Sequence, residues 1–177
     1  MKNIFPLTIL FLILISCNTS NQNQTENTNQ PTDIGSNTMD DGKINPIIVG
    51  DTNNEQIWID YIQAHNDRNL DEIAEINAED WEGYTPDGNV VKGNDAHIEF
   101  LDNWFKTSNP QWKIKSMIAN AAENEDGVMT QWLTTGNDYT NIDEEGNELL
   151  EHHVHDIQFT NGKIKRINVY SRSKPQE

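Results

Sequence analysis

The feature that most constrains this chain is a change of hydrophobic period at Pro110. Before this proline, apolar residues recur at helical spacing, and after it they alternate as in strands. Helices are expected over 54–67, from 69 to 76, and from 94 to about 106. Strands are expected over 111–121, 127–135, 148–160 and 163–171. This order predicts an α+β domain over 51–173, with three N-terminal helices packed on one face of a curved antiparallel sheet, and leaves a short tail over 174–177.

The extreme N-terminus is typical of an export signal. Lys2 supplies a positive charge, and residues 4–15 are almost wholly apolar. As a helix this stretch would span roughly 18 Å, which is shorter than the ~30 Å hydrocarbon core of a bilayer. We therefore predict a signal peptide over 1–16 and not a membrane-spanning anchor.

Leu14-Ile15-Ser16-Cys17 resembles the bacterial lipobox, in which a small residue precedes the cysteine that is lipidated. Cys17 is the chain's single cysteine, and a polar tract follows it. The alternative is an ordinary secretory signal with a chance cysteine. Acylation of Cys17 would anchor the chain stably, because each buried CH₂ contributes about 0.8 kcal/mol. Asn18 stands where inner-membrane retention uses Asp, so the resemblance implies a lipid-anchored protein of the cell envelope, at the outer membrane and facing the periplasm.

Residues 17–50 are predicted to be the lipidated cysteine followed by a disordered tether. Residues 18–39 are mostly Asn, Gln, Thr and Ser, with no apolar period, so they cannot bury enough surface to offset the entropy of ordering. The short apolar stretch over 44–49 has two interpretations: it packs on the edge of the domain, or it ends the linker.

The charge and the cysteine count exclude several classes of protein. The chain has 12 Lys and Arg against 29 Asp and Glu, a formal charge of −17. Nucleic-acid binding needs clustered cations, so we expect no nucleic-acid partner. One cysteine excludes a disulfide scaffold and a multi-cysteine metal site. The membrane contact is expected to come from the lipid on Cys17 alone.

Three pieces of the domain carry a resemblance to a known family. They are DYIQAHNDRNLDEI at 60–73, Pro86-Asp87-Gly88 with Gly93 before the third helix, and FTNGKI at 159–164. In this order they resemble the NTF2-like superfamily and, within it, the SnoaL-like group. The resemblance implies a cone with a pocket at its open end. It also leaves a homodimer open, because many domains of this fold dimerise through the sheet. This fold hosts isomerases, cyclases, dehydratases and binding proteins, so it does not settle the function.

The resemblance extends to ketosteroid isomerase, which uses a carboxylate base with a tyrosine and a protonated aspartic acid as its oxyanion hole. The oxyanion tyrosine falls on Tyr61. The carboxylate base falls on Thr85, which cannot abstract a proton from carbon, and the oxyanion aspartate falls near His155. Asp80 and Asp87 are alternative bases. One role of three is kept, which argues against this isomerase chemistry.

A histidine cluster at 152–155 is the most suggestive local feature. Strand alternation places His153 and His155 on the same face as Ile157 and Phe159, which should point into the cone. With Tyr61, these two histidines would form the polar end of an aromatic pocket. The pocket walls are expected from Trp81, Tyr84, Thr85, Trp104 and Trp132.

Two simpler interpretations of this cluster stay open: structural histidines bonded to neighbours, and a metal site completed by His97 or a carboxylate. We predict no metal and no cofactor. The function favoured by the sequence is the binding of a small, partly apolar ligand or a partner protein without catalysis. The alternative is an isomerase, cyclase or dehydratase in which His155 or His153 transfers protons alongside Tyr61.

Overall fold

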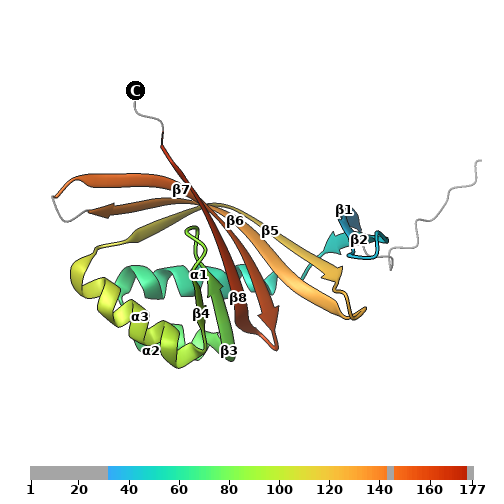
Figure 1. Ribbon diagram of the computed structural model, residues 1–177, viewed down its shortest axis with the longest axis horizontal. Helices are drawn as coiled ribbons and strands as arrows, with labels where there is room; N and C mark the ends of the chain where they lie inside the picture. The colour runs from blue at the N-terminus through green and yellow to red at the C-terminus, as the bar shows by residue number, and fades with distance from the viewer. Residues whose placement is uncertain (1–31, 143–145, 175–177) are drawn as a thin grey trace, which may run out of the picture. The chain divides into compact units, whose positions relative to one another are not determined.

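The computed structural model describes residues 32–142 and 146–174, so the predicted signal peptide, Cys17 and the first part of the tether lie outside the described residues. The elements run in the order β1 (Asp33–Thr38), β2 (Ile44–Val49), α1 (Asn53–Asp67), α2 (Leu70–Ile76), β3 (Asn77–Tyr84), β4 (Val90–Lys92), α3 (Asn94–Thr107), β5 (Gln111–Glu123), β6 (Met129–Ile142), β7 (Glu148–Thr160) and β8 (Lys163–Ser173) (Figure 1). Among these residues, no helix combines the length and the apolar character that crossing a bilayer requires.

The strands form one bent sheet with the order β1-β2-β5-β6-β7-β8-β3-β4. Strands β5 to β8 are joined as antiparallel neighbours. However, β3 pairs with β8 in parallel, so the sheet is mixed and the prediction of a wholly antiparallel sheet is wrong. This pairing follows from the order of the elements. Strand β4 occupies one side of β3, and β8, the last of the four long strands after α3, pairs with the other side.

The order of helices and strands also differs from the prediction. Two strands precede α1, and the β3–β4 hairpin separates α2 from α3. Figure 1 shows the three helices together on the concave side of the long strands. Trp81, expected in the pocket wall, lies within β3, which begins at Asn77.

Residues 33–49, which composition places in the tether, form the β1–β2 hairpin in the structure. This hairpin extends the sheet through the pairs Ile48–Ala121 and Val49–Asn120 of β2 and β5. The Asn45 side chain donates a hydrogen bond of 3.0 Å to Glu123. The segment is ordered because strand β5 supplies hydrogen-bond partners for its backbone. Its own side chains bury too little apolar surface to order it alone. The apolar stretch over 44–49 therefore packs on the domain edge.

Helix α1 buries one stripe of side chains at helical spacing, comprising Trp58, Tyr61, Ile62 and His65. It ends at Arg68, whose backbone is left-handed and whose guanidinium donates 2.8 Å to the Pro110 carbonyl. This stripe packs on the concave face of the sheet, where Leu133 of β6 and Ile157 of β7 are fully buried. The alternation predicted for β7 is observed, with its residues 153, 155, 157 and 159 buried.

Candidate functional site

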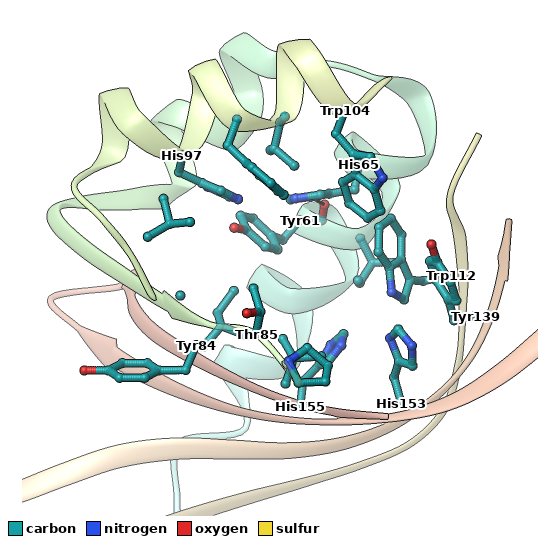
Figure 2. A pocket seen from close by; sticks show the side chains of 18 of the residues that line it. Tyr61, His65, Tyr84, Thr85, His97, Trp104, Trp112, Tyr139, His153 and His155 are labelled. Carbon is teal, nitrogen blue, oxygen red and sulfur yellow. Dashed lines mark hydrogen bonds between the residues drawn. The ribbon is translucent and has the colours of Figure 1, made fainter. Parts of the chain in front are cut away.

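A cavity of about 350 Å³ lies between the helices and the concave face of the sheet (Figure 2). Helices α1 and α3 form one wall, and strands β3 to β8 form the other. The lining is mainly aromatic and aliphatic. Its polar side chains include Tyr61, Tyr84, Thr85, Tyr139, Glu151 and four histidines, His65, His97, His153 and His155.

Most of the residues predicted from the sequence line this cavity. They are Tyr61, Trp81, Tyr84, Thr85, Trp104, His153 and His155. The prediction for Trp132 is wrong, because this residue borders a separate depression beside Asp156. Alternation along β6 turns its neighbour Leu133 inward and leaves Trp132 on the opposite face, where its indole Nε1 donates 2.9 Å to Thr130.

Tyr61 projects from α1 into the interior and is 2 % exposed. Its buried hydroxyl has no hydrogen-bond partner. Burial raises the pKa of Tyr61 well above 10, and the nearby Trp81 and Asn77 side chains oppose this shift only in part. The hydroxyl is therefore protonated at neutral pH and available as a donor. It does not bond His155, whose Nδ1 also has no partner. The Trp58 ring packs against both side chains, with centroids 5.5 Å from Tyr61 and 5.2 Å from His155.

His153 and His155 lie on the sheet wall, as Figure 2 shows. The Nδ1 atom of His155 is buried without a partner, and burial lowers the pKa of this histidine to about 3. His153 is held differently: its Nε2 lies 2.8 Å from Glu151 Oε2, and its ring stacks on Tyr139 with centroids 4.4 Å apart. Burial lowers the pKa of His153, and Glu151 opposes the shift. Glu151 thus orients the His153 ring.

Two further histidines lie on the helix wall. Sequence reasoning did not name His65 for the pocket, and it named His97 only as a third ligand of a metal site. His65 follows Tyr61 by one helical turn, so the helical spacing was the signal that should have placed it inward. Its Nδ1 lies 2.8 Å from the Tyr61 carbonyl oxygen, and burial lowers its pKa to about 4. His97 of α3 stacks on Trp81 with ring centroids 3.8 Å apart. Burial lowers the pKa of His97 well below 6.5.

Thr85 lies where the resemblance implied a catalytic carboxylate. Its hydroxyl is engaged with Asp87, and it also lies 3.1 Å from the Asn89 carbonyl oxygen. Asp80, the other alternative base, pairs with Lys165 at an exposed position. Among the described residues that line the cavity, Glu151 is the one carboxylate.

No group of three or more His, Cys, Asp and Glu side chains within residues 32–142 and 146–174 is arranged to hold a metal ion. His97, considered above as a third ligand, instead faces His65 across the helix wall, with ring centroids 5.9 Å apart. The cavity therefore presents its histidines as two separate sets, one on the helices and one on the sheet.

A bent mixed sheet closed by three helices around an apolar cavity defines the NTF2-like class of α+β domains. Within this class, the chain belongs to the SnoaL-like domain family, whose profile matches residues 58–167. The comparison with curated protein sequences finds no match.

Solved structures support the fold assignment. An NTF2-like protein of unknown function from Burkholderia pseudomallei superposes with a TM-score of 0.58 at 18 % identity, covering 69 % of this chain and 92 % of that one. An LEH-like epoxide hydrolase from M. tuberculosis gives 0.55 at 13 % identity, covering 66 % and 80 %. The epoxide hydrolase/cyclase-like enzyme SalBIII of salinomycin pyran ring formation gives 0.51 at 20 % identity, covering 68 % and 91 %. At these identities the likeness concerns the fold alone.

Proposed function

We propose that the domain binds a small, neutral and largely apolar ligand in its cavity without chemical conversion. One observation carries this proposal: the cavity combines apolar walls with four histidines whose pKa values are all lowered by burial. These histidines are uncharged at neutral pH. An anionic ligand would lose its hydration there without gaining a counter-charge, and the one lining carboxylate, Glu151, is engaged with His153. An apolar ring would instead gain contacts with the aromatic lining.

The size of the cavity supports the same conclusion. A volume of about 350 Å³ is at the lower end of the range for small-molecule sites. It suits a molecule of two or three rings. A partner protein would instead have to use the outer surface of the domain, so the cavity favours the small ligand over the partner protein.

We further propose that this binding domain is carried on a lipid anchor at Cys17. The anchor and the signal peptide lie outside the described residues, and the proposal is supported by the lipobox-like sequence at 14–17. It would place the cavity in the cell envelope, at the outer membrane and facing the periplasm. Replacement of Cys17 by serine should release the protein from the membrane fraction and remove the acyl mass from the N-terminal peptide.

Ligand binding can be tested with the neutral probe N-phenyl-1-naphthylamine, whose fluorescence rises in apolar surroundings. The chain from residue 18 onward retains every described element and lacks the lipid that would compete for the probe. We expect saturable binding at one site per chain, lost in Val169→Phe, which fills the cavity. Ile118→Phe, at an exposed position, is the matched control. Absence of binding, or equal binding by both variants, would overturn the proposal.

A second candidate function is acid–base conversion of the bound ligand. The observation that favours it is the 2.8 Å contact between Glu151 and His153, because a carboxylate that orients an imidazole is a common arrangement for general base catalysis. The names of two structural neighbours, an epoxide hydrolase and an epoxide hydrolase/cyclase-like enzyme, agree with conversion of small ring compounds. In this candidate, His153 or His155 transfers protons and Tyr61 donates a hydrogen bond to the developing negative charge.

The catalytic candidate is testable by proton exchange at carbon. The neutral ketone 1-tetralone would be incubated with the protein in D₂O, and loss of its α-proton signal would be followed by NMR. Catalysis predicts faster exchange than in buffer, with a reduced rate in Glu151→Gln and an unchanged rate in His152→Asn. Exchange at the buffer rate would leave binding without this chemistry.

A further inference from the structure

We infer that His65 and His97 form a hydrogen-bonding pair that selects a hydroxyl group, so that the ligands of this cavity are neutral ring alcohols or phenols. The inference rests on the proposed function and adds to it the chemical class of the ligand. It depends on which nitrogen of each ring carries the proton, and the surroundings of both rings decide this.

His65 is held in one tautomer by its own helix. Its Nδ1 lies 2.8 Å from the carbonyl oxygen of Tyr61, and a carbonyl oxygen can only accept. The proton of the neutral ring must therefore be on Nδ1. The Nε2 atom is left as an acceptor, and His65 lines the cavity.

His97 is held in the other tautomer by a chain of side-chain amides. Asn94 donates 3.0 Å to the Ala74 carbonyl oxygen, so its Oδ1 faces the other way and accepts 2.9 Å from the Asn77 amide nitrogen. That same nitrogen lies 3.0 Å from His97 Nδ1. Because an amide nitrogen can only donate, His97 Nδ1 must accept and the proton of the neutral ring is on Nε2.

The two rings face one another across the helix wall. Their centroids are 5.9 Å apart and their planes are inclined by 33°. Figure 2 shows a nitrogen of His97 directed toward His65, with the Tyr61 hydroxyl nearby. Two hydrogen bonds of about 2.8 Å that share one oxygen atom can join nitrogens up to about 5.6 Å apart, which is comparable with the separation of the two ring centroids. The pair thus offers one acceptor, His65 Nε2, and one donor, His97 Nε2–H, to the same small group.

A hydroxyl group is complementary to this arrangement because its single oxygen donates and accepts. It would donate to His65 and accept from His97. An ether or a ketone only accepts, so it would leave the His65 nitrogen unpaired in an apolar cavity, which costs free energy. A carboxylate has no proton to donate and would bury its charge. The neutral state of both rings is consistent with an uncharged alcohol or phenol.

Binding of three probes that share one ring system tests the inference. These are 2-naphthol, which donates and accepts, 2-methoxynaphthalene, which only accepts, and naphthalene, which does neither. We expect wild type to bind 2-naphthol about fivefold or more tighter than 2-methoxynaphthalene, since one neutral hydrogen bond contributes roughly that factor. The affinities would be measured by calorimetry or probe displacement at pH 7.5 with the chain from residue 18 onward.

Asparagine variants separate the role in binding from the role in folding. An asparagine side chain places a polar atom near the position of histidine Nδ1 and has nothing at Nε2. His65→Asn can therefore keep the bond to the Tyr61 carbonyl, and His97→Asn can keep the bond to Asn77. Each variant should reduce the preference for 2-naphthol over naphthalene about fivefold. His152→Asn, which alters a histidine bonded to Asp138 outside the cavity, should leave the preference unchanged.

Nitrogen NMR of the free protein gives an independent readout. We expect His65 in the Nδ1–H form and His97 in the Nε2–H form, and the opposite form of either ring would overturn the inference. Equal affinity for all three probes would also overturn it while leaving the proposed apolar binding site intact. Failure of all three probes, naphthalene included, would overturn both, because it would remove the binding site itself.

Discussion

Acidification from pH 7 to pH 5 should destabilise this domain strongly, because it buries histidines in their neutral form. Burial lowers the pKa of His65 to about 4 and that of His155 to about 3. In the unfolded chain, both residues titrate near 6.5. At pH values between 6.5 and the folded-state pKa values, the unfolded state binds protons that the folded state does not. Stability is therefore complete above about pH 6.5 and is lost progressively as the pH falls toward the folded-state pKa values.

The magnitude follows from the difference between the two states. At pH 5, an unfolded histidine is stabilised by protonation by about 2 kcal/mol, while the two buried rings are still neutral. His65 and His155 together would lower the free energy of unfolding by about 4 kcal/mol, and His97 acts in the same direction. Typical domains have 5–15 kcal/mol in total. This effect alone would therefore remove a large part of the stability.

Urea unfolding followed by tryptophan fluorescence at pH 8, 7, 6 and 5 measures this loss. The chain carries 29 acidic residues, and their partial neutralisation relieves repulsion as the pH falls, which opposes the effect of the histidines. Comparison of variants removes this background: His65→Asn and His155→Asn should each flatten the dependence by up to one proton. Equal slopes in wild type and in both histidine variants would refute the reasoning.

Three substitutions test the packing around the cavity. Gly83→Ala would drive a methyl group into the Trp81 ring, so it should cost about 1–3 kcal/mol in urea unfolding and weaken probe binding, whereas Gly35→Ala, with its nearest neighbours at 3.8 Å, should do neither. Leu133→Ala, at a fully buried position, should lower the free energy of unfolding by about 2–5 kcal/mol, and a smaller loss would mean that the core relaxes into the space. Trp132→Phe should leave probe affinity within twofold of wild type, and a larger loss would show that Trp132 does contribute to the cavity.

The sequence predicted the long elements well because each carries its own periodic signal. The expected helix over 54–67 corresponds to α1, and the expected strand over 148–160 corresponds to β7. The β1–β2 hairpin was missed for a physical reason. Its residues have too little apolar surface to fold locally, and they become ordered only by pairing with β5, which comes about 70 residues later in the chain. The parallel pairing of β3 with β8 depends on distant partners in the same way.

The error at Trp132 shows the limit of side-chain type as a guide to a site. Aromatic residues are common in pockets, but only the register of β6 determines which face each one occupies. Leu133 and Thr135 face inward, so Trp132 must face outward. On β7 the same alternation predicted the inward placement of His153 and His155, because Ile157 and Phe159 on the same face mark the side of the core.

For His65 and His97, the position of the ring and the position of its proton are determined by different parts of the chain. The tautomer of His65 is set within one helical turn, by the carbonyl oxygen of Tyr61, so the local sequence contains the required information. The tautomer of His97 is set by Asn77, which lies 20 residues earlier and is itself oriented by Asn94. Only the tertiary structure therefore makes one ring an acceptor and the other a donor. Asn77→Ala replaces no residue that lines the cavity, but it removes the bond that holds the His97 tautomer. It should therefore weaken the preference for 2-naphthol over naphthalene in the same probe measurement, and an unchanged preference would mean that Asn77 does not set the specificity.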